Sequence, residues 1–225
     1  MFILDETDSI ANHFLADLRN VEVQKDREKF RLNLTKLGQI LAYEISKSLG
    51  YQNEEIETPL SKTTVRVSRD EIVLISILRA AEPFANGFLS TFPDAEVGFV
   101  GVSRKGHSMT EIEADLGYVA CPNLDGKVLI IADPMLATGK SLLETLDSLK
   151  TFGKPKQTHI ASLIAAPEGI EYLKQNSEQE CNFWTCALDK ELNEKGYIVP
   201  GLGDAGDLSF GVKVDCFKCC LIYCF

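Results

Sequence analysis

A stretch near the middle of the chain combines a strand pattern with residues that could hold a phosphate group. Five apolar residues, 128–132, are followed by Asp133 and then by the loop PMLATGKS at residues 134–141. Leucines at helical spacing come next, so the loop leads into a helix. The start of a helix offers free backbone N–H groups and partial positive charge, and the hydroxyls of Thr138 and Ser141 can donate hydrogen bonds as well. The pattern indicates a phosphate site, with the acid at the strand end placed to accept hydrogen bonds from sugar hydroxyls.

Two other interpretations of this loop compete with the first. Gly139-Lys140-Ser141 matches the end of the Walker A pattern of phosphate-transferring NTPases, but that pattern needs a glycine where this chain has Pro134. The missing hinge disfavours a small-molecule kinase. The simpler interpretation is an ordinary strand-to-helix turn capped by Thr138 or Ser141. The loop taken alone leaves that second interpretation open.

Two arginines follow other apolar runs, and each could pair with an anionic group. Arg79 comes after the run at residues 72–78, and Arg104 comes after the run at residues 97–102. A guanidinium group is always charged and can pair with two oxygens at once. A surface cation is the alternative for each. The segment 104–115 is polar and has no period, which indicates a mobile loop or two-stranded flap, or else a plain surface connection.

The elements that must position these residues form an alternating pattern. Apolar residues from Phe30 to Leu49 recur every three or four positions, which predicts an amphipathic helix that ends before Thr58-Pro59. Strand-length apolar runs lie at residues 72–78, 97–102, 128–132 and 160–165, and a helical run lies at 141–149. Such alternation predicts an α/β fold with a parallel sheet covered on both faces and a ligand at the carboxyl ends of the strands.

The bulk composition limits the classes of function. The chain has 225 residues, of which 45% are hydrophobic and 25% charged, which suits one globular domain. A net charge of −10 argues against a nucleic-acid partner, because a polyanion would be repelled by most of the surface. The N-terminus has no signal-peptide pattern, and no apolar run is long enough to span a membrane. We therefore expect a cytoplasmic protein with no membrane partner.

These motifs resemble those of a known family. The string from Asp133 to Ser141 resembles the signature of type I phosphoribosyltransferases, in the form found in uracil phosphoribosyltransferases. The stretch LNEKGYIVPGLGDAGD at residues 192–207 is similar to the uracil-specific end of that family, and the resemblance extends from about His13 to Gly211. It implies a type I phosphoribosyltransferase-like α/β fold, with a central, mostly parallel sheet flanked by helices and with a flap and hood. It also implies an enzyme of pyrimidine salvage, which transfers the phosphoribosyl group of phosphoribosyl diphosphate to uracil and yields UMP and diphosphate.

The resemblance also implies roles for single residues. The catalytic residues would be Arg79, Arg104 and Asp204. Uracil would be bound by Ile198, Gly203, Asp204 and Ala205, and phosphoribosyl diphosphate by Arg79, Arg104, Asp133, Pro134, Met135, Leu136, Ala137, Thr138, Gly139, Lys140, Ser141 and Asp204. Mg²⁺ would arrive with the diphosphate. We expect no metal site built by the protein, because His13, His107 and His159 are far apart and lack ligand spacing.

Four positions depart from the family pattern. Lys140 and Ala81 stand where many members have glycine, Ser103 stands in place of a tyrosine, and Ala120 stands in place of a lysine. The departures at Ala81, Ser103 and Ala120 support a second hypothesis, a non-catalytic sensor on the same fold that binds phosphoribosyl diphosphate or a nucleotide. The resemblance also implies that the chain assembles as a homodimer or larger homo-oligomer and that it binds GTP. The quoted motifs encode neither property.

The last residues form a cysteine-rich tail. The family pattern stops near Gly211, so we expect a single domain at residues 1–211 and an added tail at 212–225 with cysteines at 216, 219, 220 and 224. The tail lacks the second ligand pair of a zinc site, and Ile222 occupies the position where prenylation needs cysteine. Palmitoylation stays open. We favour an apolar tail that packs on the surface or is disordered.

Overall fold

The computed structural model describes residues 1–105 and 113–213, with the backbone alone at residues 103–105 and 113–115. The middle of the expected flap and the cysteines at 216–224 therefore lie outside the described residues. Within the described part, no helix is long and apolar enough to cross a membrane.

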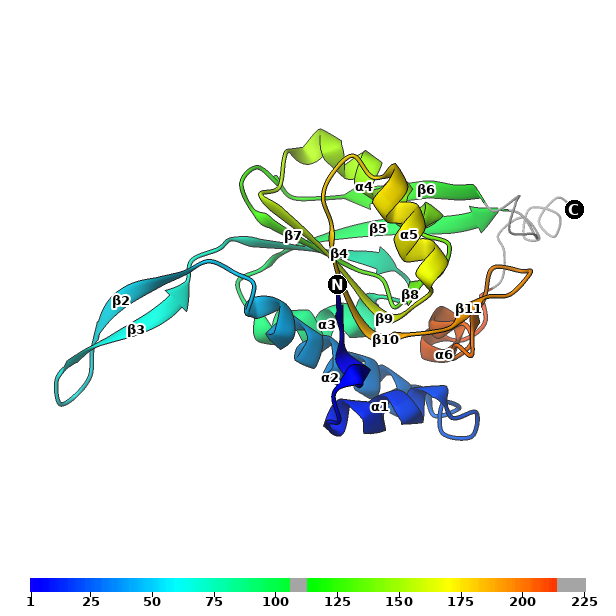
Figure 1. The fold of residues 1–225 in the computed structure, drawn as a ribbon, viewed down its shortest axis with the longest axis horizontal. Helices are drawn as coiled ribbons and strands as arrows, with labels where there is room; N and C mark the ends of the chain where they lie inside the picture. Colours follow the sequence, from blue (N-terminus) through cyan, green and yellow to red (C-terminus); the bar gives the residue numbers. More distant parts are fainter. Residues whose placement is uncertain (106–112, 214–225) are drawn as a thin grey trace, which may run out of the picture.

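One sheet forms the centre of the molecule (Figure 1). Neighbouring strands are parallel except for the last pair, β5 and β6, which is antiparallel. The short β8 (Met135–Leu136) pairs with β9 beside this path. In spatial order the sheet contains β1 (Phe2–Ile3), β10 (Asn182–Leu188), β9 (Gln157–Ala165), β7 (Val128–Ala132), β4 (Ile72–Leu78), β5 (Glu96–Lys105) and β6 (Glu113–Ala120).

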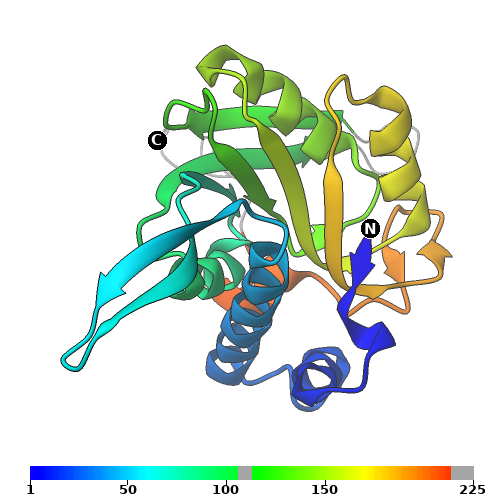
Figure 2. The same cartoon turned by 60° about the vertical axis from the view of Figure 1, so that its left-hand side comes forward.

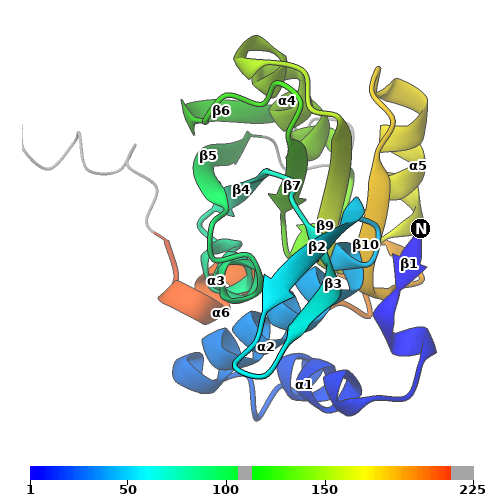
Figure 3. The same ribbon diagram turned by 90° about the vertical axis from the view of Figure 1, so that its left-hand side faces the viewer.

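Helices cover both faces of this sheet (Figures 2 and 3). On one face lie α2 (Arg27–Ser46) and α3 (Glu82–Thr91), with α1 (Ile10–Arg19) packed along α2; on the other lie α4 (Lys140–Leu149) and α5 (Pro167–Asn176). Helices α2 and α3 approach closely because each has a glycine at the crossing. A Cβ atom at Gly38 would lie 2.1 Å from the carbonyl oxygen of Phe84, and one at Gly87 would lie 2.1 Å from that of Thr35.

The predicted elements are present, with small shifts of their ends. Strands β4 and β7 have the predicted bounds. Strands β5 and β9 are longer than their apolar runs, because strand pairing continues through polar residues at one end of each run. The predicted helix from Phe30 to Leu49 begins earlier, since the side chain of Asp26 accepts a hydrogen bond from the Lys29 N–H, and it ends before Leu49, which is buried in a following turn.

A long antiparallel hairpin was not predicted. Strands β2 (Tyr51–Glu57) and β3 (Lys62–Ser68) pair over their full length and project from the body of the molecule (Figure 1). Most of their side chains are exposed, and Leu60 at the tip is 96% exposed. With so few side chains buried, the strands lack the apolar alternation that marks a half-buried strand. The break at Thr58-Pro59 is the turn between them.

The hood, residues 191–210, lies at the opposite end of the molecule from this hairpin, beyond the carboxyl ends of the parallel strands (Figure 1). It consists of β11 (Glu191–Leu192), β12 (Ile198–Val199) and the short helix α6 (Ala205–Phe210), joined by glycine-rich turns. The fold therefore places the motif at residues 192–207 beside the carboxyl ends of the strands, where the phosphate loop also begins.

A buried histidine lies in β9, beside the neighbouring strand β10. His159 is 1% exposed, and its Nδ1 atom accepts a hydrogen bond of 2.9 Å from Nε1 of Trp184. The Nε2 atom is buried and has no hydrogen-bond partner among the described residues. Burial lowers the pKa of His159 from 6.5 to about 4. The folded protein therefore holds this histidine neutral at pH values where the unfolded chain would bind a proton.

This difference predicts a loss of stability in mild acid. Because the unfolded state binds the extra proton as pH falls from 6.5 toward 4, His159 should lower the free energy of unfolding by about 2 kcal/mol between pH 7 and pH 5. Urea melts at both pH values should show this loss reduced in His159→Asn, where the amide cannot titrate. The exposed His13→Asn variant serves as the control and should keep the wild-type loss. An unchanged pH dependence in His159→Asn would contradict the assignment.

Candidate active site

A cavity of about 370 Å³ lies between the strand ends and the hood. Most of its lining comes from three segments that are distant in the sequence: the end of β4 with the following turn, the phosphate loop at residues 133–141, and the hood. Most of the predicted site residues meet there, namely Arg79, Asp133, Met135, Ala137, Ser141, Ile198, Gly203, Asp204 and Ala205. The structure thus brings the two family motifs, at residues 133–141 and 192–207, together at one cavity.

The phosphate loop enters helix α4 through a glycine. Gly139 has φ +76°, a left-handed conformation that favours glycine, and a Cβ atom there would lie 2.6 Å from the carbonyl oxygen of Gly169. The N-cap residue of α4 is Gly139 itself, which has no side chain to cap the helix. The Thr138 hydroxyl accepts only a long hydrogen bond of 3.5 Å from the Lys140 N–H. The capped-turn interpretation therefore finds little support, and the start of α4 is built from backbone groups.

Other residues of the loop face away from the main cavity. Pro134 is buried, and its carbonyl oxygen accepts hydrogen bonds of 3.1 and 3.0 Å from the N–H groups of Leu163 and Ile164 in β9. Leu136, Thr138 and Gly139 line a small niche beside the main cavity. Lys140 lines neither space. Pro134 thus anchors the loop to the sheet, and its neighbours Asp133 and Met135 line the cavity.

Helix α5 supports the loop from behind. A Cβ atom at Gly169 would lie 2.1 Å from the carbonyl oxygen of Ala137, so the backbones touch at this point. We expect Gly169→Ala to displace the phosphate loop, to raise roughly tenfold the KM for phosphoribosyl diphosphate, the substrate that the sequence resemblance implies, and to destabilise the fold by about 1–3 kcal/mol.

Steady-state kinetics and thermal melts would measure both effects of Gly169→Ala. Gly117→Ala is the matched control, because a Cβ atom at Gly117 has nothing within 4 Å and its backbone conformation suits any residue. Equal KM values and equal melting temperatures in the two variants would show that the close backbone contact at Gly169 does not position the phosphate loop.

The hood presents backbone groups to the cavity. Ile198 and Ala205 are buried, and Gly203 has φ +97°, a conformation that few other residues adopt. Asp204 begins helix α6, and its side chain accepts a hydrogen bond of 2.9 Å from the Asp207 N–H. Because the turn is fixed by this cap and by the glycine, its N–H and C=O groups are held in place before a ligand arrives.

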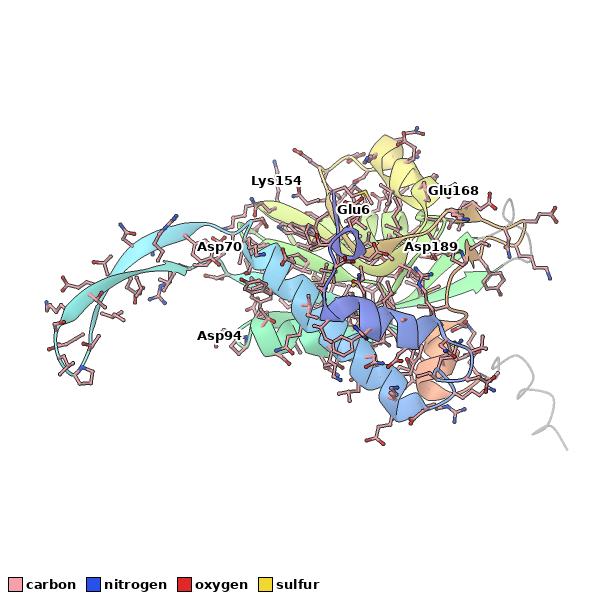
Figure 4. All side chains as sticks on the ribbon, turned by 60° about the horizontal axis from the view of Figure 1, so that its bottom comes forward. Glu6, Asp70, Asp94, Lys154, Glu168 and Asp189 are labelled. Carbon is pink, nitrogen blue, oxygen red and sulfur yellow. The ribbon has the colours of Figure 1, made fainter. Side chains whose placement is uncertain are left out.

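Two acidic side chains hold the hood against the rest of the molecule (Figure 4). Asp189 accepts hydrogen bonds of 2.6 and 3.0 Å from Arg19 and one of 2.8 Å from the Gly201 N–H. Arg19 also donates to the Gly201 carbonyl oxygen at 3.1 Å. Glu168 accepts a bond of 2.9 Å from the Leu192 N–H. No role for these residues was predicted, because Arg19 and Asp189 are 170 positions apart and nothing in the chain pairs them before it folds.

Two arginines were predicted to bind the diphosphate. Arg79 directly follows β4, and Arg104 lies within β5. Arg79 is joined to Leu78 by a cis peptide bond, and its side chain reaches Asp207 of the hood at 3.0 Å. The backbone of Arg104 pairs with Ala114 of β6, which agrees with the two-stranded flap. The side chains of Arg104, Ser103 and Lys105 lie outside the described residues. Arg79 thus lines the cavity, and the position of the Arg104 side chain remains a prediction.

Among the departures from the family pattern, Ala81 lies at the start of helix α3. Its backbone has φ −75° and ψ −16°, an ordinary helical conformation, and it is fully buried. The alanine therefore fits without backbone strain where many members have glycine.

A larger cavity of about 730 Å³ adjoins the hood beside α1 and α2. It shares Gly203 and Asp204 with the smaller cavity but does not reach the phosphate loop. The smaller cavity is therefore the candidate active site, because it alone of the two contains both the phosphate loop and the end of β4.

Comparison with known proteins identifies the family. Residues 6–212 match the family described as uracil phosphoribosyltransferase. This chain belongs to the uracil phosphoribosyltransferase family. The uracil phosphoribosyltransferase of Porphyromonas gingivalis is 42% identical over 206 residues, which are 92% of this chain and 95% of that protein. The uracil phosphoribosyltransferase of Pyrococcus furiosus is 41% identical over 203 residues, 89% of this chain and 85% of that protein.

A solved structure supports the fold in the same way. A protein from Aquifex aeolicus superposes with a TM-score of 0.83 at 35% identity, over 96% of this chain and all of that one. The mostly parallel central sheet with helices on both faces confirms the predicted α/β class. The family of uracil phosphoribosyltransferases, predicted from the motifs at residues 133–141 and 192–207, is confirmed as well.

Proposed function

We propose that this chain is a pentosyltransferase of pyrimidine salvage, which transfers the phosphoribosyl group of phosphoribosyl diphosphate to uracil and forms UMP and diphosphate. The observation that carries the proposal is the cavity itself, where the phosphate loop, Arg79 and the glycine-rich hood meet. Membership of the uracil phosphoribosyltransferase family supports the same reaction.

Each wall of the cavity suits one part of the phosphoribosyl substrate. The backbone at Ala137 and Ser141, at the start of α4, would hold the 5-phosphate. Asp133, at the end of β7, would accept hydrogen bonds from the ribose hydroxyls. Arg79 would pair with the diphosphate, and Arg104 takes a second contact by its place in the motif.

The hood would read the edge of uracil with backbone groups. Uracil offers two carbonyl oxygens on either side of one N–H, and the backbone at Ile198, Gly203 and Ala205 can supply matching donors and an acceptor. Cytosine places an amino group where one carbonyl should be. Two donors would then face each other and stay unpaired, so we expect cytosine to be rejected by several orders of magnitude, about 10⁴ in well-built sites.

The reaction is a displacement at the anomeric carbon of the ribose. The bond to the diphosphate breaks and a bond to the uracil nitrogen forms, with positive charge on the sugar and negative charge on the leaving group in the transition state. The cavity would hold both partners in line, and Arg79 and Arg104 would stabilise the departing charge. Asp204 lines the same cavity and would face the ribose or assist proton loss from uracil.

Magnesium belongs to the same proposal as an ion carried by the substrate. Within the described residues no group of three or more His, Cys, Asp or Glu side chains could hold a metal by itself. Asp133 and Asp204 both line the cavity, and Mg²⁺ suits one or two carboxylates together with substrate oxygens and water. Those two residues would hold the ion, which would neutralise charge on the diphosphate.

Assembly as a homodimer or larger homo-oligomer, a cytoplasmic location and GTP binding complete the proposal. Family membership is the support for these three properties. The net charge of −10 supports a protein without a nucleic-acid partner.

One experiment tests the reaction. Purified protein is mixed with uracil, phosphoribosyl diphosphate and Mg²⁺, and UMP and diphosphate are measured, with cytosine replacing uracil as the control. UMP formed from uracil and nothing measurable from cytosine would support the proposal. Binding of phosphoribosyl diphosphate without UMP formation would instead support the ligand sensor that the departures at Ser103 and Ala120 suggested.

A further inference from the structure

The side chain of Arg79 is held by the hood. Its Nη2 atom lies 3.0 Å from Oδ1 of Asp207 and 3.4 Å from the carbonyl oxygen of Gly211. The arginine side chain is 43% exposed, so packing alone does not fix its direction. These two contacts use one nitrogen of the guanidinium group and leave it open toward the cavity that Arg79 lines.

Asp207 is itself fixed in place. Its N–H donates a 2.9 Å hydrogen bond to Oδ1 of Asp204, and its own Oδ1 also accepts a 3.3 Å bond from the Lys213 N–H. Asp207 does not line the cavity, whereas Asp204 and Arg79 do. One turn of α6 therefore joins Asp204, which lines the cavity, to Asp207, which contacts Arg79.

We propose that Asp207 is a positioning residue, which holds Arg79 in the orientation that receives the diphosphate. This inference rests on the proposed function, since it assigns Arg79 the diphosphate of that reaction. A long exposed arginine loses conformational freedom when it is ordered by a ligand. The bond to Asp207 orders it before the substrate binds, and the remaining donors of the guanidinium group face the ligand.

The opposite role for Asp207 gives an effect of opposite sign. If Asp207 merely occupied the arginine until the diphosphate displaced it, removing the carboxylate would free Arg79 and tighten substrate binding. If Asp207 orients the arginine, removing the carboxylate weakens binding, even though a negative charge near the diphosphate is lost. The direction of the change in KM therefore separates the two roles.

The test uses the full-length chain and the variant Asp207→Asn, which keeps the side-chain size. We expect KM for phosphoribosyl diphosphate to rise about tenfold, with kcat and KM for uracil changed less than about threefold. Asp207→Glu keeps the charge and should recover most of the lost affinity. The exposed Asp94→Asn, at the other end of the molecule (Figure 4), is the matched control and should behave as wild type.

A double-mutant cycle shows whether Asp207 acts through Arg79. In the background of Arg79→Ala, Asp207→Asn should add less than about a twofold change, because the interaction is already absent. A fall in KM in the single variant, an unchanged KM, or equal effects of Asp207→Asn in both backgrounds would overturn the inference. Failure of the wild-type protein to form UMP is a separate result, which would overturn the proposed function instead.

Discussion

Replacing Arg79 with alanine is expected to lower kcat/KM for UMP formation by about a hundredfold or more. The arginine lines the cavity at the end of β4, beside Ala80 and opposite the phosphate loop. In the proposed reaction, negative charge grows on the diphosphate as its bond to the ribose breaks. A guanidinium group that pairs with two oxygens stabilises that charge more strongly in the transition state than in the ground state.

Initial-rate kinetics with uracil and phosphoribosyl diphosphate would measure this loss for Arg79→Ala. Arg79→Lys should retain only part of the activity, because an ammonium group lacks the planar fork of donors. Arg66→Ala, on the projecting hairpin, removes an exposed arginine elsewhere and serves as the control. Wild-type kinetics in Arg79→Ala would remove this residue from the active site.

Replacing Arg19 with alanine is expected to destabilise the protein by about 3–5 kcal/mol, the usual effect of leaving a buried charge without its partner. The side chain of Asp189 is only 4% exposed, and Arg19 supplies two of its hydrogen bonds. Asp5 lies within electrostatic reach of both groups. Its pKa is raised, by burial first and also by Asp189, while Arg19 acts to lower it. Without the arginine, the carboxylates of Asp5 and Asp189 would repel each other without a cation between them.

The pH dependence gives this prediction a second signature. A carboxyl group whose pKa is raised in the folded state binds its proton there before the unfolded state does, so stability is gained as pH falls. Removing Arg19 should raise the pKa of Asp5 further. The destabilisation measured by urea unfolding should therefore be smaller at pH 5 than at pH 7.

Two further variants complete the test of Arg19. Arg19→Met combined with Asp189→Asn removes both charges and keeps an acceptor for the Gly201 N–H, so it should recover much of the lost stability. The control Arg66→Ala should change the free energy of unfolding by less than about 0.5 kcal/mol. An Arg19→Ala variant as stable as wild type would show that Asp189 finds another partner.

Local sequence predicted the parts of the fold whose signals lie within one segment. The runs at residues 72–78 and 128–132 are strands with those bounds, because a strand buried on both faces must be apolar throughout. The phosphate loop was recognisable for a similar reason, since Gly139 and the helix that follows it are neighbours in the chain. The hairpin of β2 and β3 escaped prediction because its exposed side chains carry no such signal.

The sequence by itself thus determined the α/β class, the phosphate loop and the family motif of the hood, since these depend on residues close together in the chain. The tertiary structure decided which residues support them. It joined Arg19 to Asp189 and Arg79 to Asp207, pairs that are 170 and 128 positions apart. The physical reason is that an ion pair depends on distance in space and leaves no periodic pattern along the sequence, so only the packed sheet and hood bring its two charges together.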